Sequence, residues 1–170
     1  FKYNDINGLY KIIKKNQNKI AAIVLEPSTI NCPYPEHKKT GCPGEQSCIG
    51  KKNYKNKNFL QEVQKLCKKH KIVFILDEMI TGFRWHLNGA QKLYNVKPDL
   101  STFGKAMANG FSISAVCGKK EIMRLGSIEK KGQQRLFLAS STFGAEMIGL
   151  GAFVKTLKFV KEKNVIKKNW

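Results

Sequence analysis

The sequence lacks the marks of a secreted or membrane-spanning protein. It has no initiator Met and no charged-then-apolar leader, and no apolar run approaches the roughly 18 residues of a membrane span. From the missing Met we expect that the natural start lies further upstream. Cysteine is present in an odd number, five, and nothing in its placement demands an oxidising compartment. We therefore expect a cytoplasmic protein.

Acidic residues are also scarce. Twelve Asp and Glu stand against 31 Lys and Arg, which gives a formal net charge of +19. Most of the positive charge is Lys scattered among Asn, as in "KKNYKNKN", without the Arg clusters and interleaved aromatic residues that bind nucleic acids. We interpret the lysines as solvated faces, and we expect neither a nucleic acid nor a membrane as a partner.

Helical and strand patterns alternate in the first half of the chain. Apolar residues recur at helical spacing over 4–19 and 58–71, and continuous apolar runs at 20–27 and 72–76 predict short strands. A long loop at 28–56, rich in Pro, Gly, Lys and Cys, separates the first predicted helix and strand from the second pair. Strands that are apolar throughout are typical of a parallel sheet with helices on both faces, so the fold class is α/β.

The second half continues the same alternation. It predicts a short helix over 87–97, strands within 98–105 and 112–118, and a long helix over 143–163 with small residues on its packing face. No repeat and no break in composition marks a second domain. Two further thiols, Cys67 on a helical apolar face and Cys117 in a strand-like apolar run, are expected to be buried.

Ionisable residues follow directly on three of the predicted strands: Glu26, Asp77 and Lys105. Ligands of open α/β sheets bind beyond the carboxyl ends of the strands. Pyridoxal phosphate needs a Lys amine for a Schiff base with its aldehyde and a carboxylate beside its ring nitrogen. Asp77 and Lys105, with Gly104 and Gly110 supplying backbone freedom, match that requirement, and the cofactor would in turn satisfy a carboxylate at the end of a buried strand.

Three stretches carry a resemblance to a known family: "ILDEMITGFR", "GAQKLYNVKPDLSTFGKAMANGFSISAVCGKKEIM" and "SSTFGAEMIGLGA". Together they closely resemble the class III aminotransferases, a group that includes glutamate-1-semialdehyde aminomutase. The resemblance implies the large domain of a fold type I pyridoxal-phosphate-dependent transferase. It further implies that Lys105 is the Schiff-base lysine and that Asp77 pairs with the pyridine nitrogen. Met79 would pack on the cofactor ring, and Thr142 would bind the phosphate of the neighbouring subunit's cofactor in a homodimer.

Other residues of the resembling motifs have less defined roles. Glu26 and Pro27 match an "EP" at a strand end, where structural support and chemistry both remain open. Glu78 and Arg84 are interpreted as members of a salt bridge that stabilises the loop. The family extends well beyond this chain on both sides, so we interpret residues 1–170 as the central part of the large domain, without the phosphate cup before it or the small domain after it, and inactive alone.

The loop at 28–56 departs from the family. It carries Cys32, His37, Cys42 and Cys48, which could bind zinc tetrahedrally, but their spacing contains no C-x-x-C pair. We therefore expect a loop with reduced thiols and no metal.

The predicted function is transfer of an amino group from a small-molecule donor to a carbonyl acceptor, of the keto acid or sugar type. An aminomutase, which moves the group within one molecule, is the alternative; "GKAMANGFSISA" lacks the "GGGLP"-like run associated with it. An alternative of another class is a basic binding module that keeps the fold without catalysis, but such a module would need neither Asp77 nor Lys105.

Overall fold

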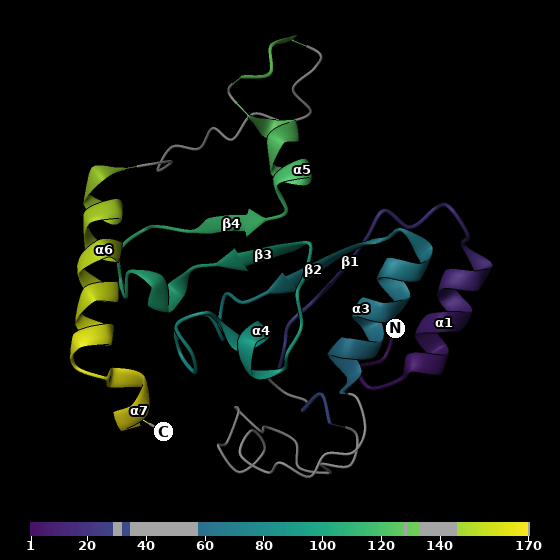
Figure 1. Cartoon of the computed structure of the whole chain (residues 1–170), viewed down its shortest axis with the longest axis horizontal. Coiled ribbons are helices and arrows are strands. Elements are labelled where there is room, and N and C mark those ends of the chain that lie inside the picture. The colour runs from purple at the N-terminus through teal and green to yellow at the C-terminus, as the bar shows by residue number, and fades with distance from the viewer. Residues whose placement is uncertain (29–31, 35–57, 128, 133–145, 170) are drawn as a thin grey trace.

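A four-stranded sheet organises the chain (Figure 1). The computed structural model describes residues 1–28, 32–34, 58–127, 129–132 and 146–169. The strands lie side by side in chain order, β1 (Ala22–Leu25), β2 (Val73–Asp77), β3 (Leu100–Phe103) and β4 (Ala115–Gly118). The first three are mutually parallel and β4 runs antiparallel to β3. The mostly parallel sheet predicted from the sequence is confirmed.

Two amphipathic helices, α1 (Ile6–Lys15) and α3 (Phe59–His70), lie next to each other beside the sheet. The Asp5 side chain caps α1 by accepting a hydrogen bond from the amide of Gly8, at 2.8 Å. Asn58 and Gln61 form a reciprocal capping box at the start of α3. Because these signals are local, both helices form where the sequence predicts them.

The core lies between these helices and one face of the sheet. Ile23, Phe74 and Leu76 point into it and are at most 5% exposed. On the opposite face, Val24 is 57% and Val116 52% exposed. Within the described residues the helices therefore cover one face, and the second helical layer that we expected is not found there. Burial of each large aliphatic side chain in this core stabilises the fold by about 1.5–3 kcal/mol.

Helix α4 (Ala90–Leu93) is shorter than the segment 87–97 predicted for it. Gly89 has a φ of +75° and its amide binds the carbonyl of His86 at 3.0 Å, which makes the preceding residues a turn. A helix can start only after such a residue, so apolar spacing alone overestimated its length.

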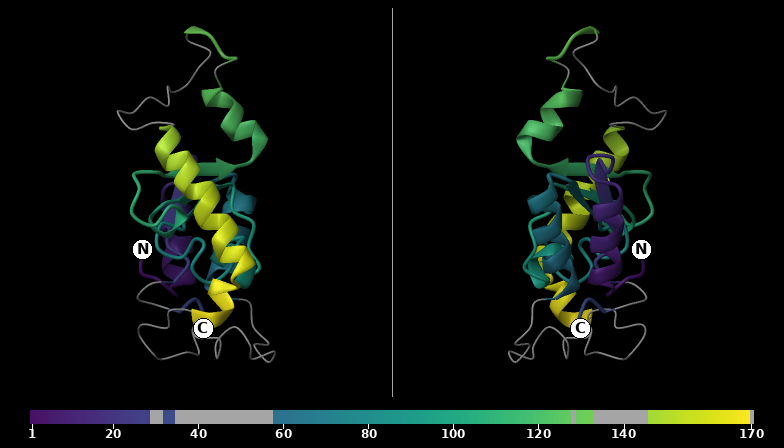
Figure 2. Two further views of the ribbon diagram at one scale, coloured as in Figure 1. Left: turned by 90° about the vertical axis from the view of Figure 1, so that its left-hand side faces the viewer. Right: turned by 90° about the vertical axis from the view of Figure 1, so that its right-hand side faces the viewer.

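Helix α6 (Met147–Glu162) crosses beyond the carboxyl ends of β2 and β3 (Figures 1 and 2). It approaches the short 3₁₀ helix η1 (Lys105–Met107). A Cβ at Gly149 would lie 3.2 Å from the carbonyl oxygen of Ser112, so the helix backbone packs closely on this face. The remaining elements are the short helices α5 (Lys120–Met123), η2 (Arg124–Gly126) and α7 (Val165–Asn169).

Two described cysteines have opposite environments. Cys67 is 1% exposed in the core, and burial raises the pKa of its thiol to about 12, so it packs as a neutral apolar side chain. Cys117 is exposed, so the prediction of a buried thiol there is wrong. Its strand, β4, pairs with β3 alone among the described strands, and no described helix covers the Cys117 side chain. None of the helices in the described ranges is long and apolar enough to cross a membrane.

Candidate active site

The carboxyl ends of β1, β2 and β3 bring the three strand-end ionisable residues to one edge of the sheet. Leu25 pairs with Leu76, so Glu26 and Asp77 follow at the same level of neighbouring strands. Asp77 pairs with Thr102 of β3, and Lys105 comes three residues later in the chain. Parallel pairing is what gathers these residues, because all three strands end at the same edge.

The carboxylate of Asp77 is held by two donors. The amide of Met79 and the hydroxyl of Thr102 each donate to Oδ1, both at 3.0 Å. Within the part of the chain that the structure describes, Oδ2 receives no hydrogen bond. The side chain is half-buried, so Oδ2 is available to a cationic group placed beyond the strand end.

Lys105 begins η1 directly after β3. Its φ of +45° lies in the left-handed region, which costs an L-residue about 1 kcal/mol or more and turns the chain sharply at the strand end. The side chain is exposed, and its ammonium has no hydrogen-bond or ion-pair partner among the described residues. An amine in this position can reach a ligand without first breaking an internal contact.

The side chain of Met79 lies against the backbone just before Lys105. A Cβ built on Gly104 would be 2.4 Å from Cε and 2.9 Å from Sδ of Met79, so the tip of the Met79 side chain occupies the space that the glycine leaves open. The structure thus gathers Asp77, Met79 and Lys105 at the neighbouring ends of β2 and β3. Thr142, the fourth predicted site residue, lies outside the described residues, as do His37, Cys42 and Cys48; Cys32 is described, and its side chain is buried.

Glu26 is exposed, whereas Pro27, the residue after it, is buried. The hydroxyl of Tyr3 donates a hydrogen bond to the carbonyl oxygen of Pro27. Burial raises the pKa of Tyr3, which keeps the phenol protonated and able to donate. This contact ties the start of the chain to the end of β1.

Glu78 has a structural role different from the one predicted. Its carboxylate is fully buried and accepts hydrogen bonds from the Thr81 hydroxyl at 3.0 Å and from the amides of Ala90 and Gln91 at 2.6 and 3.0 Å. All these donors are neutral, so the predicted salt bridge of Glu78 is wrong. Glu78 instead anchors the first turn of α4 to the end of β2.

Replacing Glu78 with Gln is expected to lower the free energy of unfolding of the complete protein by about 1–3 kcal/mol. The Gln side chain has one acceptor oxygen where Glu78 has two, and its NH₂ group would face the N–H and O–H donors that now bind the second oxygen. At least one buried donor would then have no acceptor. Thermal unfolding measures the loss. Glu121→Gln makes the same chemical change at an exposed position and should alter stability by less than about 0.5 kcal/mol. Equal effects in both variants would contradict the anchoring role.

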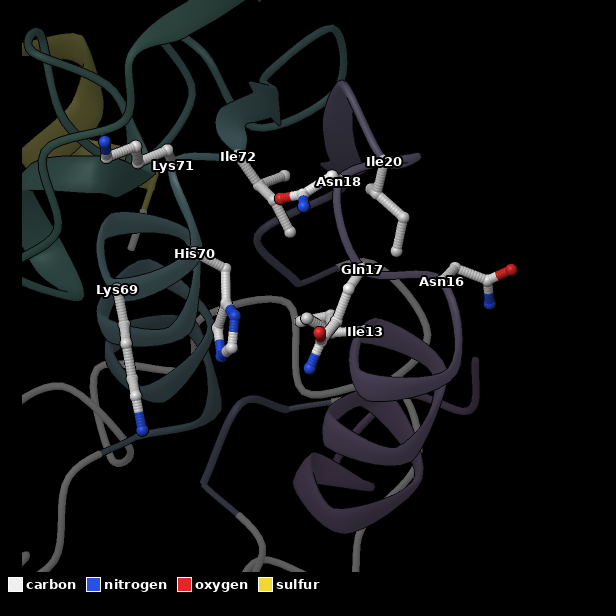
Figure 3. Close-up of a pocket in the computed structure, with 9 residues that line it drawn as sticks. All are labelled: Ile13, Asn16, Gln17, Asn18, Ile20, Lys69, His70, Lys71 and Ile72. Carbon is white, nitrogen blue, oxygen red and sulfur yellow. The ribbon is translucent and has the colours of Figure 1, made fainter.

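A separate pocket of about 400 Å³ lies between the ends of α1 and α3 (Figure 3). Ile20 and Ile72, which precede β1 and β2, help to line it, and His70 and Gln17 point toward each other across it. It therefore lies at the amino ends of the strands, on the opposite edge from Asp77, and it is not part of the strand-end site.

Two features of the site escaped the sequence analysis. Thr102 binds Asp77, and only the register of the parallel pair could have indicated it. Phe83 lies between two other rings, with centroids 5.5 Å from that of Phe103 and 5.6 Å from that of Phe153, and so joins α6 to the end of β3. No spacing within the sequence connects these three aromatic residues.

The mostly parallel sheet brings Asp77 and Lys105 to the ends of neighbouring strands. The sequence profile described as "Aminotransferase class-III" matches residues 46–169, and the chain belongs to the class III aminotransferase family. Pyridoxal 5′-phosphate is the cofactor of this family. The donor set of the site fits it: the Lys105 amine, which has no partner among the described residues, the second oxygen of Asp77 and the side chain of Met79.

Relatives are found among both transaminases and aminomutases. The chain is 36% identical over 166 residues to the 3-aminobutyryl-CoA aminotransferase of Cloacimonas acidaminovorans, with 98% of this chain and 34% of that protein covered. It is 38% identical over 162 residues to the glutamate-1-semialdehyde 2,1-aminomutase of Nitrosopumilus maritimus, with 94% and 32% covered.

Solved structures show the same fold. An omega-transaminase from Sphaerobacter thermophilus matches with a TM-score of 0.70 and 25% identity, over 94% of this chain and 32% of that chain. The chain spans about a third of the length of the curated relatives it matches.

Proposed function

We propose that the complete protein uses pyridoxal 5′-phosphate to move an amino group from a small-molecule donor to a carbonyl acceptor. The observation that carries this proposal is the placement of Asp77, Met79 and Lys105 at the neighbouring ends of β2 and β3. Membership in the class III aminotransferases and the named 3-aminobutyryl-CoA aminotransferase relative support it. The acceptor is a keto acid or a sugar-type carbonyl compound.

Each site residue has a distinct task. When bound, the cofactor supplies an aldehyde that takes up the amino group and a ring that accepts electrons from the substrate's α-carbon. Nζ of Lys105 would hold the cofactor and would move the proton released from the substrate's α-carbon. The Asp77 carboxylate keeps a proton on the ring nitrogen through an ion pair. Met79 supplies apolar packing against the ring.

The active form is proposed to be a homodimer. The resemblance of Thr142 to the threonine that binds the neighbouring subunit's cofactor supports a second copy as the partner. The start of α6, shortly after Thr142, carries Met147 and Ile148, which are 81% and 70% exposed. A cytoplasmic location is proposed as well, and the free thiols of Cys67 and Cys117 agree with a reducing compartment.

An aminomutase is the second candidate. The 38% identical relative named glutamate-1-semialdehyde 2,1-aminomutase favours it. The two activities differ in their need for a second substrate, because a mutase moves the amino group within one molecule and a transferase requires a separate acceptor.

The test is to assay the complete, cofactor-loaded protein with glutamate-1-semialdehyde alone and, separately, with amino donors paired with keto acids. Turnover only with a donor–acceptor pair is the expected result. Isomerisation of the single substrate would establish the aminomutase instead. Absence of both activities together with salt-sensitive binding to nucleic acid would overturn the enzyme assignment in favour of a basic binding module.

A further inference from the structure

The hydroxyl of Thr102 is built into the sheet beside the catalytic carboxylate. Thr102 is the register partner of Asp77 in the parallel β2–β3 pair, so both side chains lie on the same face of the sheet. Oγ1 of Thr102 donates to Oδ1 of Asp77 at 3.0 Å. The amide of Glu78 donates to the carbonyl oxygen of Thr102, also at 3.0 Å, which fixes the threonine backbone at this level.

The side chain of Thr102 is well suited to hold a fixed direction. A β-branched residue has restricted χ1 freedom, so its hydroxyl is oriented before any ligand binds. With the amide of Met79, it places two donors on the same oxygen of Asp77. Two donors on Oδ1 restrict rotation of the carboxylate. The oxygen left over is Oδ2.

We propose that Thr102 is a positioning residue, which orients Asp77 so that Oδ2 meets the protonated ring nitrogen of the cofactor. This inference rests on the proposed function, because it concerns the same cofactor. Thr102 touches neither substrate nor cofactor in this role, and it acts only through the carboxylate. Its effect should therefore depend on whether the bound ring carries a nitrogen.

The variants that test the role are Thr102→Val, which keeps the shape and removes the hydroxyl, and Thr102→Ser, which keeps the hydroxyl. Ser101→Ala is the matched control. Ser101 is the preceding residue of β3, so its side chain points to the opposite face, where its hydroxyl accepts a hydrogen bond from Nε2 of Gln91 at 3.3 Å. Thermal unfolding of the cofactor-free variants measures any general loss of stability.

Two ligands provide the readout: pyridoxal 5′-phosphate and its analogue with carbon in place of the ring nitrogen. Equilibrium dissociation constants for the cofactor-free complete protein are measured by absorbance titration. Thr102→Val is expected to weaken binding of the natural cofactor about tenfold, the typical effect of losing a hydrogen bond to a charged group, and to leave binding of the carbon analogue unchanged. Thr102→Ser and Ser101→Ala should bind both ligands as the unaltered protein does.

Equal weakening for both ligands in Thr102→Val would overturn the proposal, because it would show a general structural effect. Unchanged binding of both ligands would overturn it as well. These outcomes are distinct from failure of the proposed function, in which the unaltered protein would fail to bind the natural cofactor. The ratio of the two dissociation constants stays informative even if the variant is less stable.

Discussion

Replacing Asp77 with Asn should slow the transamination half-reaction about a thousandfold or more, on the order of 4 kcal/mol of transition-state stabilisation. Asn keeps the shape of the side chain and can still accept hydrogen bonds from Met79 and Thr102 at its carbonyl oxygen. It lacks the negative charge that keeps the ring nitrogen protonated, so the ring accepts electrons poorly. The cofactor should still bind, because Lys105 is unaltered.

Single-turnover mixing of cofactor-loaded protein with an amino donor, followed by visible absorbance, measures the rate. Asp5→Asn is the matched control, because it makes the same chemical change at a carboxylate whose described hydrogen bond is to the amide of Gly8, and Asn is also a good N-cap for α1. Its half-reaction rate should equal that of the unaltered protein. A near-normal rate for Asp77→Asn would refute the assigned role of the carboxylate.

Replacing Lys105 with Ala is expected to abolish covalent attachment of the cofactor and to reduce turnover by about 10⁴-fold or more. The variant loses both the attachment point and the group that moves the α-carbon proton. In the unaltered protein, borohydride reduction should fix the cofactor permanently, and peptide mapping should find the label on Lys105. The exposed, partnerless ammonium in the described structure agrees with this accessibility.

Lys97→Ala provides the control for the lysine experiment. Lys97 is exposed in the same segment of the chain, and the hydrogen bond to Gln64 uses its backbone amide, which the substitution keeps. Labelling and turnover should remain unchanged in this variant. A label on a lysine other than Lys105, or retained attachment in Lys105→Ala, would contradict the assignment.

The local elements of the fold could be predicted because their signals are short in range. The apolar spacing of α1 and α3 and the caps at Asp5 and Asn58 lie within a few residues of the backbone groups they stabilise. The apolar runs of β1 and β2 ended close to where the strands end. The family resemblance, which rests on contiguous motifs around Asp77 and Lys105, is confirmed by the class III aminotransferase match.

Burial was harder to predict, because it depends on what packs on each residue from outside its own segment. The apolar run of β1 gives no sign that Val24 faces the uncovered side of the sheet in the described residues, or that Ile23 faces the core. Cys117 has the same apolar sequence neighbours that a buried strand would have, but it is exposed, because no described element covers its side chain.

By itself, the sequence determined which chemical groups this protein offers: an amine at Lys105, a carboxylate at Asp77 and the glycine that precedes the lysine. Only the tertiary structure decided how these groups are held. The register of two parallel strands pairs Thr102 with Asp77. The fold brings the amide of Ala90 to the carboxylate of Glu78, so Glu78 anchors α4 and does not form the ion pair that we predicted. Hydrogen-bond partners 12 to 25 residues apart are set by how strands and turns pack, and no local pattern encodes that packing.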